Sequence, residues 1–179
     1  MKILLLSYYF EPDLSAGSFR SSALYKRLKN LGHEVEVITT LPNRYNGFEG
    51  KINNELNSDS TRIFRIDTKN DNSKFLAQIR AYVKFFFGAL KITKKTDYDI
   101  VYASSSKLFT AFLGAVISKR NKSLLYLDIR DIFLESLRDI FNPFISFFLL
   151  PILSLIERYT FNHANHINLV SEGFKSYFT

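Results

Sequence analysis

MKILLLSYYFEPDLSAGSFRSSALYKRLKNLGHEVEVIT, residues 1–39, decides the fold of this chain. The apolar run at residues 3–6 is too short for a helix and has the length of a parallel strand buried on both faces. Pro12 excludes regular structure from the loop that follows. A helical pattern comes next, and residues 35–38 begin a second strand. The stretch therefore predicts one strand–helix–strand unit.

The helix of this unit has start and stop signals in the sequence. Ser15 or Ser18 can cap its N-terminus, and Gly32 ends it. An apolar stripe at spacings of four and three is formed by Leu24, Leu28 and Leu31. Because the first loop opens on the helix N-terminus, free N–H groups and the positive end of the helix dipole are offered there to an anion.

The rest of the chain continues the alternation of strands and helices. Further strands are predicted at 61–67, 99–103, 123–129 and 165–170. Helices are predicted at 73–95, 106–120 and 134–162, with breaks near Pro143 and Pro151, and another helix starts near Gly173. This alternation predicts the α/β class, with a doubly wound, Rossmann-like parallel sheet of six or seven strands. A chain of 179 residues fits one such domain, 1–179.

Composition excludes several classes of protein. No cysteine is present, which excludes disulfides and thiolate metal sites. The apolar start runs into Glu11 and Pro12 without a small-residue cleavage site, so we interpret it as a strand and not a signal peptide.

The apolar stretch 144–156 is shorter than the ~20 residues that span a bilayer. We interpret it as a buried helix or two short helices, with a surface resting on a membrane as the alternative.

Positive charge is concentrated in the middle of the chain. Of a net charge of +7, residues 61–122 supply 13 basic and 4 acidic side chains. Four basic residues of the predicted helix 73–95 form one stripe at spacings of four, seven and four: Arg80, Lys84, Lys91 and Lys95. Two interpretations stay open, a solvated face of a helix packed on the sheet or a helix resting on anionic lipid. No motif beyond charge points to nucleic acid, and we expect no nucleic-acid partner.

Ordered motifs resemble a known family. The patterns Y-F-x-P-x-x-x-A-G-x-x-R and L-x-x-x-G-H-E-V-x-V-I-T, followed by YDIVYASSS (98–106), LLYLDIRDIFLESL (124–137) and IERYTFNHANHINLVSEGFKSYF (156–178), resemble the N-terminal domain of family 4 glycosyltransferases. These are retaining enzymes of the GT-B fold, and the Arg-Asp turn resembles a capsule and O-antigen subgroup of bacterial polysaccharide enzymes.

The resemblance implies a function and a missing half. The chain would be the acceptor-side domain of an enzyme that moves a sugar from a nucleotide-sugar donor to a lipid-linked or cell-surface saccharide. A second, C-terminal domain, absent from this chain, would carry the paired glutamates and most of the donor site. We therefore expect the isolated chain to be inactive, to need no cofactor because the nucleotide sugar is a substrate, and to be cytoplasmic, peripheral on the inner face of the plasma membrane.

Candidate site residues gather at one predicted edge of the sheet. In open α/β sheets the ligand lies beyond the carboxyl ends of the strands, where the strand order reverses. If the order is 3-2-1-4-5-6, that point lies between the first and fourth strands. The predicted substrate-binding residues are Gly17, Ser18, Ser104, Ser105, Asp128, Arg130, Asp131 and Glu172. The alternatives to ligand binding are structural: Gly17 only permits the turn, and a serine among 104–106 caps the next helix.

Arg130 and Asp131 are the catalytic candidates, with no role assigned. By resemblance, Arg130 stands where many relatives have a histidine that contacts the donor sugar. An arginine stays protonated and cannot act as a general base, but it can bind a phosphate or a sugar hydroxyl. The alternative to ligand binding is that Arg130 forms a structural ion pair with Asp128 or Asp131. His163 and His166 do not suggest metal ligation, and we predict no metal site.

Two other functions compete with glycosyl transfer. A dinucleotide-dependent oxidoreductase fits poorly, because the chain has no G-x-G-x-x-G and its second strand ends without an acid to bind a ribose. A non-catalytic Rossmann-like module that binds a nucleotide or sugar, or docks on a membrane, is the alternative that stays open.

Overall fold

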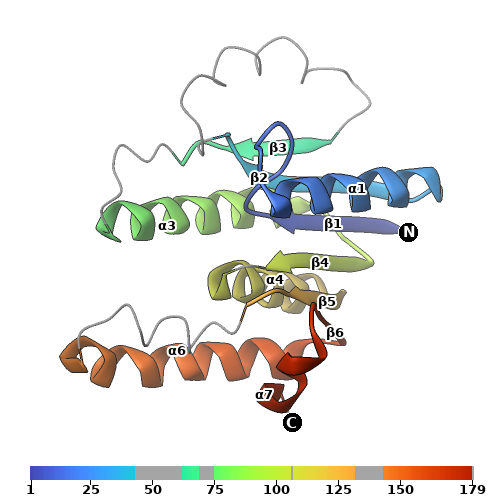
Figure 1. Ribbon diagram of the computed structural model, residues 1–179. Coiled ribbons are helices and arrows are strands. Elements are labelled where there is room, and N and C mark those ends of the chain that lie inside the picture. The colour runs from blue at the N-terminus through green and yellow to red at the C-terminus, as the bar shows by residue number, and fades with distance from the viewer. Residues whose placement is uncertain (43–61, 69–74, 106, 132–142, 179) are drawn as a thin grey trace.

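Six parallel strands form one sheet in the computed structural model of the chain (Figure 1). The structure describes residues 1–42, 62–68, 75–105, 107–131 and 143–178. The strands are β1 (Lys2–Ser7), β2 (Glu34–Thr40), β3 (Ile63–Ile66), β4 (Ile100–Ser105), β5 (Leu124–Ile129) and β6 (His166–Leu169). Their order is β3-β2-β1-β4-β5-β6, and every neighbouring pair is parallel. The predicted fold class is confirmed.

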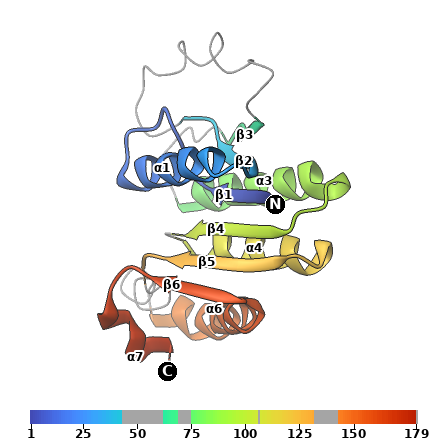
Figure 2. The same cartoon turned by 90° about the vertical axis from the view of Figure 1, so that its right-hand side faces the viewer.

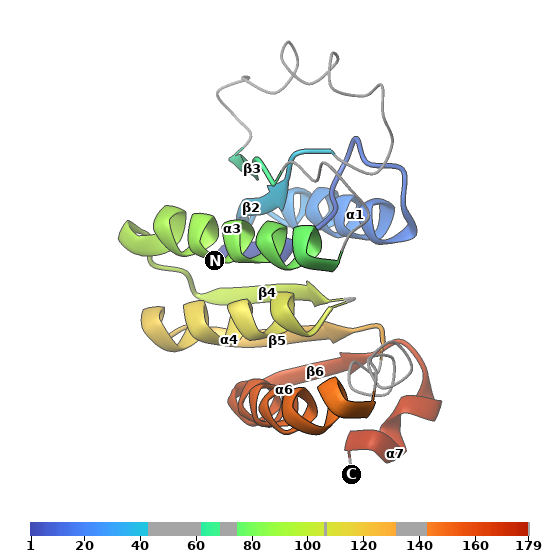
Figure 3. The ribbon, with the colours of Figure 1, turned by 90° about the vertical axis from the view of Figure 1, so that its left-hand side faces the viewer.

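Helices cover both faces of this sheet. On one face lies α1 (Ala16–Asn30), and on the other lie α3 (Phe75–Ile92), α4 (Leu108–Asn121) and α6 (Pro143–His163) (Figures 2 and 3). The chain moves across the sheet in opposite directions from β1 and from β4, so right-handed crossovers place the helices on opposite faces. The short segments are η1 (Thr93–Lys95), η2 (Glu172–Phe174) and α7 (Lys175–Phe178).

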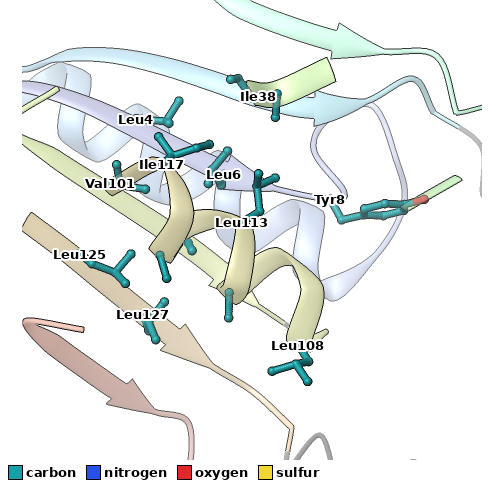
Figure 4. Packing of buried hydrophobic residues seen from close by; sticks show 14 of the residues in the cluster. Leu4, Leu6, Tyr8, Ile38, Val101, Leu108, Leu113, Ile117, Leu125 and Leu127 are labelled. Carbon is teal, nitrogen blue, oxygen red and sulfur yellow. The ribbon is translucent and has the colours of Figure 1, made fainter. Parts of the chain in front are cut away.

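Alternate side chains of the central strands enter two apolar clusters. On the side of α3, α4 and α6, the fully buried members include Leu4, Leu6, Val101, Leu113, Ile117, Leu125 and Leu127 (Figure 4). On the side of α1, the cluster consists of Ile3, Leu5, Phe10, Tyr25, Val35 and Val37. Burial on both faces explains the continuous apolar run at residues 3–6 of β1.

Two local predictions about helices need correction. Leu24 and Leu28 of the predicted apolar stripe pack against the apolar cluster on the side of α1, but Leu31 is the C-cap of the helix and is 53% exposed. The buried residues of α1 are three serines and a tyrosine, Ser18, Ser21, Ser22 and Tyr25. Pro151 lies inside the continuous helix α6 and does not break it. A proline removes one backbone donor, but Pro151 is exposed, so the carbonyl it leaves without a helical partner can bind water. The part of this predicted helix at 134–142 lies outside the described residues. In the described segments, no helix combines the length and apolarity that crossing a bilayer requires.

Gly114 allows α4 to lie close to the sheet. A Cβ at this position would lie 2.8 Å from the Cβ of Ala103 on β4 and 3.3 Å from Cδ1 of Leu125 on β5. Both neighbours are fully buried and have no free space to move into. The packing of the central helix on β4 and β5 therefore depends on the missing side chain.

We expect Gly114→Ala to destabilise the fold by about 1–3 kcal/mol, because overpacking forces the helix away from β4. Chemical denaturation followed by circular dichroism measures this. Adding Ala103→Gly opens the space again, so the double variant should lose less stability than the sum of the two single variants. Strictly additive losses would show that the close approach is unimportant.

A carboxylate is held at the amino edge of the sheet, away from the predicted ligand edge. Glu36 is 4% exposed and accepts hydrogen bonds from the Tyr98 hydroxyl at 2.6 Å and from Arg62 Nη1 at 2.7 Å, and Lys2 Nζ lies 3.4 Å away. Burial alone raises the pKa of Glu36, but these hydrogen bonds and the charge of Lys2 lower it below its usual value.

A group whose folded pKa is depressed stabilises the fold above its unfolded pKa, about 4.3 for a glutamate. We therefore expect Glu36→Gln to lower the free energy of unfolding near neutral pH. The difference from the unaltered chain should shrink as the pH falls below about 4, where the carboxylate protonates. Urea titrations across this range measure the effect. A difference that does not change with pH would contradict the assignment.

Candidate functional site

The carboxyl edge of β1 and β4 is where the strand order reverses. Beyond β1 the chain passes through residues 8–15 and enters α1, whose first turn contains Gly17. Ser15 is the N-cap, and its Oγ accepts a hydrogen bond from the backbone N–H of Ser18 at 3.1 Å. Of the two predicted caps, Ser15 is confirmed. The helix N-terminus thus opens beside the end of β4, as the fold requires.

A row of four polar residues crosses the sheet at this edge. The strand register pairs Ser7 of β1 with Ser104 of β4, Ser104 with Asp128 of β5, and Asp128 with Asn168 of β6. Since paired positions of parallel strands point to the same face, these four side chains line one side of the edge. Ser21 of α1 joins the row, with its Oγ 2.8 Å from Ser7 Oγ.

The carboxylate of Asp128 lies at the centre of this row and is fully buried. Its Oδ1 accepts hydrogen bonds from Arg20 Nη2 at 3.0 Å and from Asn168 Nδ2 at 2.7 Å. Its Oδ2 accepts from Arg130 Nε at 3.3 Å and Nη2 at 3.2 Å. A buried charge is costly unless it is paired and hydrogen-bonded, and Asp128 has both kinds of partner. Two guanidinium groups share one carboxylate, which leaves one net positive charge.

Arg130 is fixed by its neighbours on three elements. Its backbone N–H donates to the carbonyl of Ser105 at 3.1 Å, and its Nη2 donates to Ser104 Oγ at 2.7 Å. Its Nη1 lies 3.4 Å from where a Cβ of Gly17 would stand. The side chain of Arg130 is 15% exposed. The structural ion pair with Asp128 is therefore present, and it orients the guanidinium toward the first turn of α1.

The other predicted residues differ in their surroundings. Ser18 is fully buried, and its hydroxyl has no hydrogen-bond partner among the described residues. Ser105 Oγ donates to the carbonyl of Lys107, and the N-cap of α4 is Lys107, so the predicted serine cap is wrong. Ser106 lies outside the described residues.

Asp131 and Glu172 are exposed at the carboxyl ends of β5 and β6, and no described contact joins either to Arg130.

Four residues of this edge were missed from sequence: Ser7, Arg20, Ser21 and Asn168. Arg20 and Ser21 follow Gly17 by about one helical turn, so helical spacing could have placed them on the side of α1 that faces the edge. Ser7 and Asn168 depend on the strand register, for which the sequence carries no direct signal.

Aromatic side chains line the other side of the same edge. The ring of Tyr8 packs against those of Tyr82 and Phe85 at centroid distances of 4.9 and 5.2 Å. Lys107 Nζ lies 4.8 Å from the ring centroid of Tyr82 and 5.5 Å from that of Tyr8, within cation–π range. Burial raises the pKa of Tyr8 to about 12, so its hydroxyl stays neutral at physiological pH.

Among the residues that the structure describes, no group of three or more His, Cys, Asp or Glu side chains could hold a metal ion. The polar groups of the edge are the arginines, serines, asparagine and paired carboxylate described above, together with the exposed carboxylates of Asp131 and Glu172. Such a set binds an oxyanion or sugar hydroxyls by charge-assisted hydrogen bonds.

Comparisons with known proteins include a remote structural likeness. No family model matches the chain, and no curated protein matches it. Among solved structures, the chain is similar to Phytolacca americana UGT2 complexed with UDP-2-fluoro-glucose and pterostilbene, with 13% sequence identity and a TM-score of 0.41. The match covers 86% of this chain, which spans about a third (34%) of the length of that structure. A likeness at this level decides neither the family nor the activity of the chain.

We expect Asp128→Asn to destabilise the fold by about 3 kcal/mol, because it leaves two guanidinium groups without their shared carboxylate. Thermal or denaturant unfolding measures the loss. The exposed Asp97 offers a control of equal charge change, and Asp97→Asn should stay within about 0.5 kcal/mol of the unaltered chain. Equal effects of the two variants would mean that the Asp128 network contributes no specific stability.

Proposed function

We propose that this chain is the acceptor-side, N-terminal domain of a retaining GT-B glycosyltransferase of the family 4, capsule and O-antigen kind. Such an enzyme moves a sugar from a nucleotide-sugar donor to a lipid-linked or cell-surface saccharide. Two observations support this. The ordered motifs along the chain resemble that family, and the strand order brings three of their residues, Gly17, Ser104 and Arg130, together at the carboxyl edge of the sheet.

One observation carries the proposal. The guanidinium of Arg130 is held by Asp128 and Ser104 with its Nη1 beside Gly17, at the first turn of α1. A helix N-terminus and an adjacent arginine both attract an oxyanion, and a glycine leaves the backbone accessible to it. We assign this place to a phosphate of the donor, with Arg20 adding a second positive charge.

The role of Arg130 is electrostatic. In the transfer, the bond from the sugar C1 to the diphosphate oxygen breaks and a bond from C1 to the acceptor hydroxyl oxygen forms on the same face. The hydroxyl proton leaves with the nucleoside diphosphate. Negative charge develops on the diphosphate, and a preorganised arginine stabilises it. Because Arg130 stays protonated, it is not the general base.

The remaining candidates take supporting roles in this proposal. Ser104 and Ser105 keep Arg130 in place, and the exposed Asp131 and Glu172 are available to sugar hydroxyls at the same edge. Ser18 is buried and packs α1 on the sheet. A lipid-linked acceptor fits a bacterial polysaccharide enzyme that works in the cytoplasm, at the inner face of the plasma membrane. No cofactor is needed, because the nucleotide sugar is the substrate.

The test is titration calorimetry of the chain with uridine and guanosine diphosphates. We expect weak binding that Arg130→Gln reduces about tenfold or more, since a hydrogen bond to a charged group contributes about 1.5–3 kcal/mol. Gly17→Ala keeps an ordinary contact distance to Arg130 and should reduce binding without lowering the melting temperature. Arg27→Gln, at an exposed position in the last turn of α1, is the control of equal charge loss.

Two outcomes would contradict the proposal: no binding of either diphosphate at millimolar concentration, or equal loss in Arg130→Gln and Arg27→Gln. Sugar transfer is measured separately with radiolabelled nucleotide sugars. We expect none from the chain alone, because a site assembled from two domains loses its preorganised electrostatics when one is missing. Steady turnover by residues 1–179 would overturn the expectation that the chain alone is inactive.

A further inference from the structure

Helix α3 presents two neighbouring rows to solvent. One row is apolar, with Ile79, Val83 and Phe87 at 42%, 47% and 65% exposure and a spacing of four residues. The other is basic, with Arg80, Lys84 and Lys91 all exposed. At about 100° per residue the two rows lie side by side along the helix. The sequence predicted the basic row with Lys95 as its fourth member, but α3 ends at Ile92 and Lys95 lies in η1. The apolar row was missed.

The apolar row is not needed to hold α3 on the sheet. Ala81, Phe85 and Ala89 are fully buried on the opposite side of the helix, and Tyr82 and Phe86 pack against Phe109 and Phe112 of α4. Three large side chains are thus exposed on a helix that already has a complete buried side. Exposed apolar side chains grouped in this way mark a surface that meets a partner.

The same face of the sheet carries further apolar side chains on α6. Phe147, Ile152 and Leu155 are 75%, 57% and 69% exposed. Between α3 and α6 lies α4, where Phe109 is 40% exposed, so the three helices form one layer (Figure 3). The apolar stretch 144–156, interpreted from sequence as a buried helix or as a surface resting on a membrane, is therefore partly exposed.

Charge on α3 and on η1, which follows it, has one sign. Residues 72–96 contain no Asp or Glu. The end of α3 leads into the exposed Lys94 and Lys95, and the exposed Lys119 lies in the last turn of α4. An apolar row bordered by basic side chains complements a surface that is apolar inside and anionic outside.

We propose that the solvent face of α3 docks on a bilayer with anionic headgroups. Val83 and Phe87 enter the boundary between headgroups and acyl chains, and Arg80, Lys84 and Lys91 contact lipid phosphates. Amphipathic helices bind membranes with these two kinds of residue on one surface. The inference deepens the proposed function, since a lipid-linked acceptor places the enzyme at a bilayer, but vesicle binding needs no sugar donor. It can therefore fail while diphosphate binding succeeds, and the reverse.

Vesicle flotation tests the charge dependence. The chain should float with vesicles that are about one-third phosphatidylglycerol and stay behind with pure phosphatidylcholine. Each basic residue near such a surface contributes about fivefold in affinity, so Lys84→Gln with Lys91→Gln should weaken binding about 25-fold. Arg27→Gln with Lys29→Gln removes the same charge from exposed positions on α1 and should leave binding within about twofold.

Insertion of the apolar row has its own test. The chain contains no tryptophan, so Phe87→Trp is a single reporter whose emission should shift to shorter wavelength on anionic vesicles. The control is Leu31→Trp, at a position 53% exposed on α1, which should not shift. Val83→Ser with Phe87→Ser should lose binding, while Leu31→Ser keeps it.

Three results would overturn the proposal. The first is no flotation with anionic vesicles at low salt. The second is equal loss in the α3 and α1 charge variants, which would indicate unspecific attraction by net charge. The third is retention of binding in Val83→Ser with Phe87→Ser and no shift in Phe87→Trp, which would indicate electrostatic contact without insertion. Melting temperatures serve as the control for folding. We expect all variants to stay folded, because each replaced side chain is exposed.

Discussion

The buried carboxylate of Asp128 is the interaction on which the carboxyl edge of this sheet depends. It accepts hydrogen bonds from α1 through Arg20, from the end of β5 through Arg130 and from β6 through Asn168. One acidic side chain thus fixes two arginines and joins a helix to two strands. Without it, the edge would hold two guanidinium groups that repel one another beside the positive end of a helix dipole.

This arrangement decides what kind of chemistry the edge can support. It offers fixed positive charge, hydroxyl groups and free backbone N–H groups, and its two arginines cannot exchange a proton at physiological pH. Stabilisation of negative charge, such as that on a departing diphosphate, suits it better than proton abstraction. The three small buried serines of α1 contribute by letting the helix approach the strand ends closely.

Much of the fold could be predicted from the sequence, because continuous apolar runs bounded by turn residues mark doubly buried strands. Gly17 and Arg130 could be placed at the carboxyl edge because they follow the ends of β1 and β5 in the chain. Ser7 and Asn168 were not found, because strand register is set by tertiary pairing. Leu31 was placed in a buried stripe and is exposed, and Ile79 and its neighbours were missed, because an apolar spacing does not say which side of a helix another element covers.

Backbone amide mapping by nuclear magnetic resonance tests the central claim, that the β1–β4 switch edge is the ligand site. On titration with a nucleoside diphosphate, the account predicts the largest shifts at Gly17 and its neighbours in the first turn of α1, together with Arg130 at the end of β5. The amides around Glu36 at the amino edge should not move. The largest shifts at the amino edge, or along α3 with none at Gly17, would contradict the account.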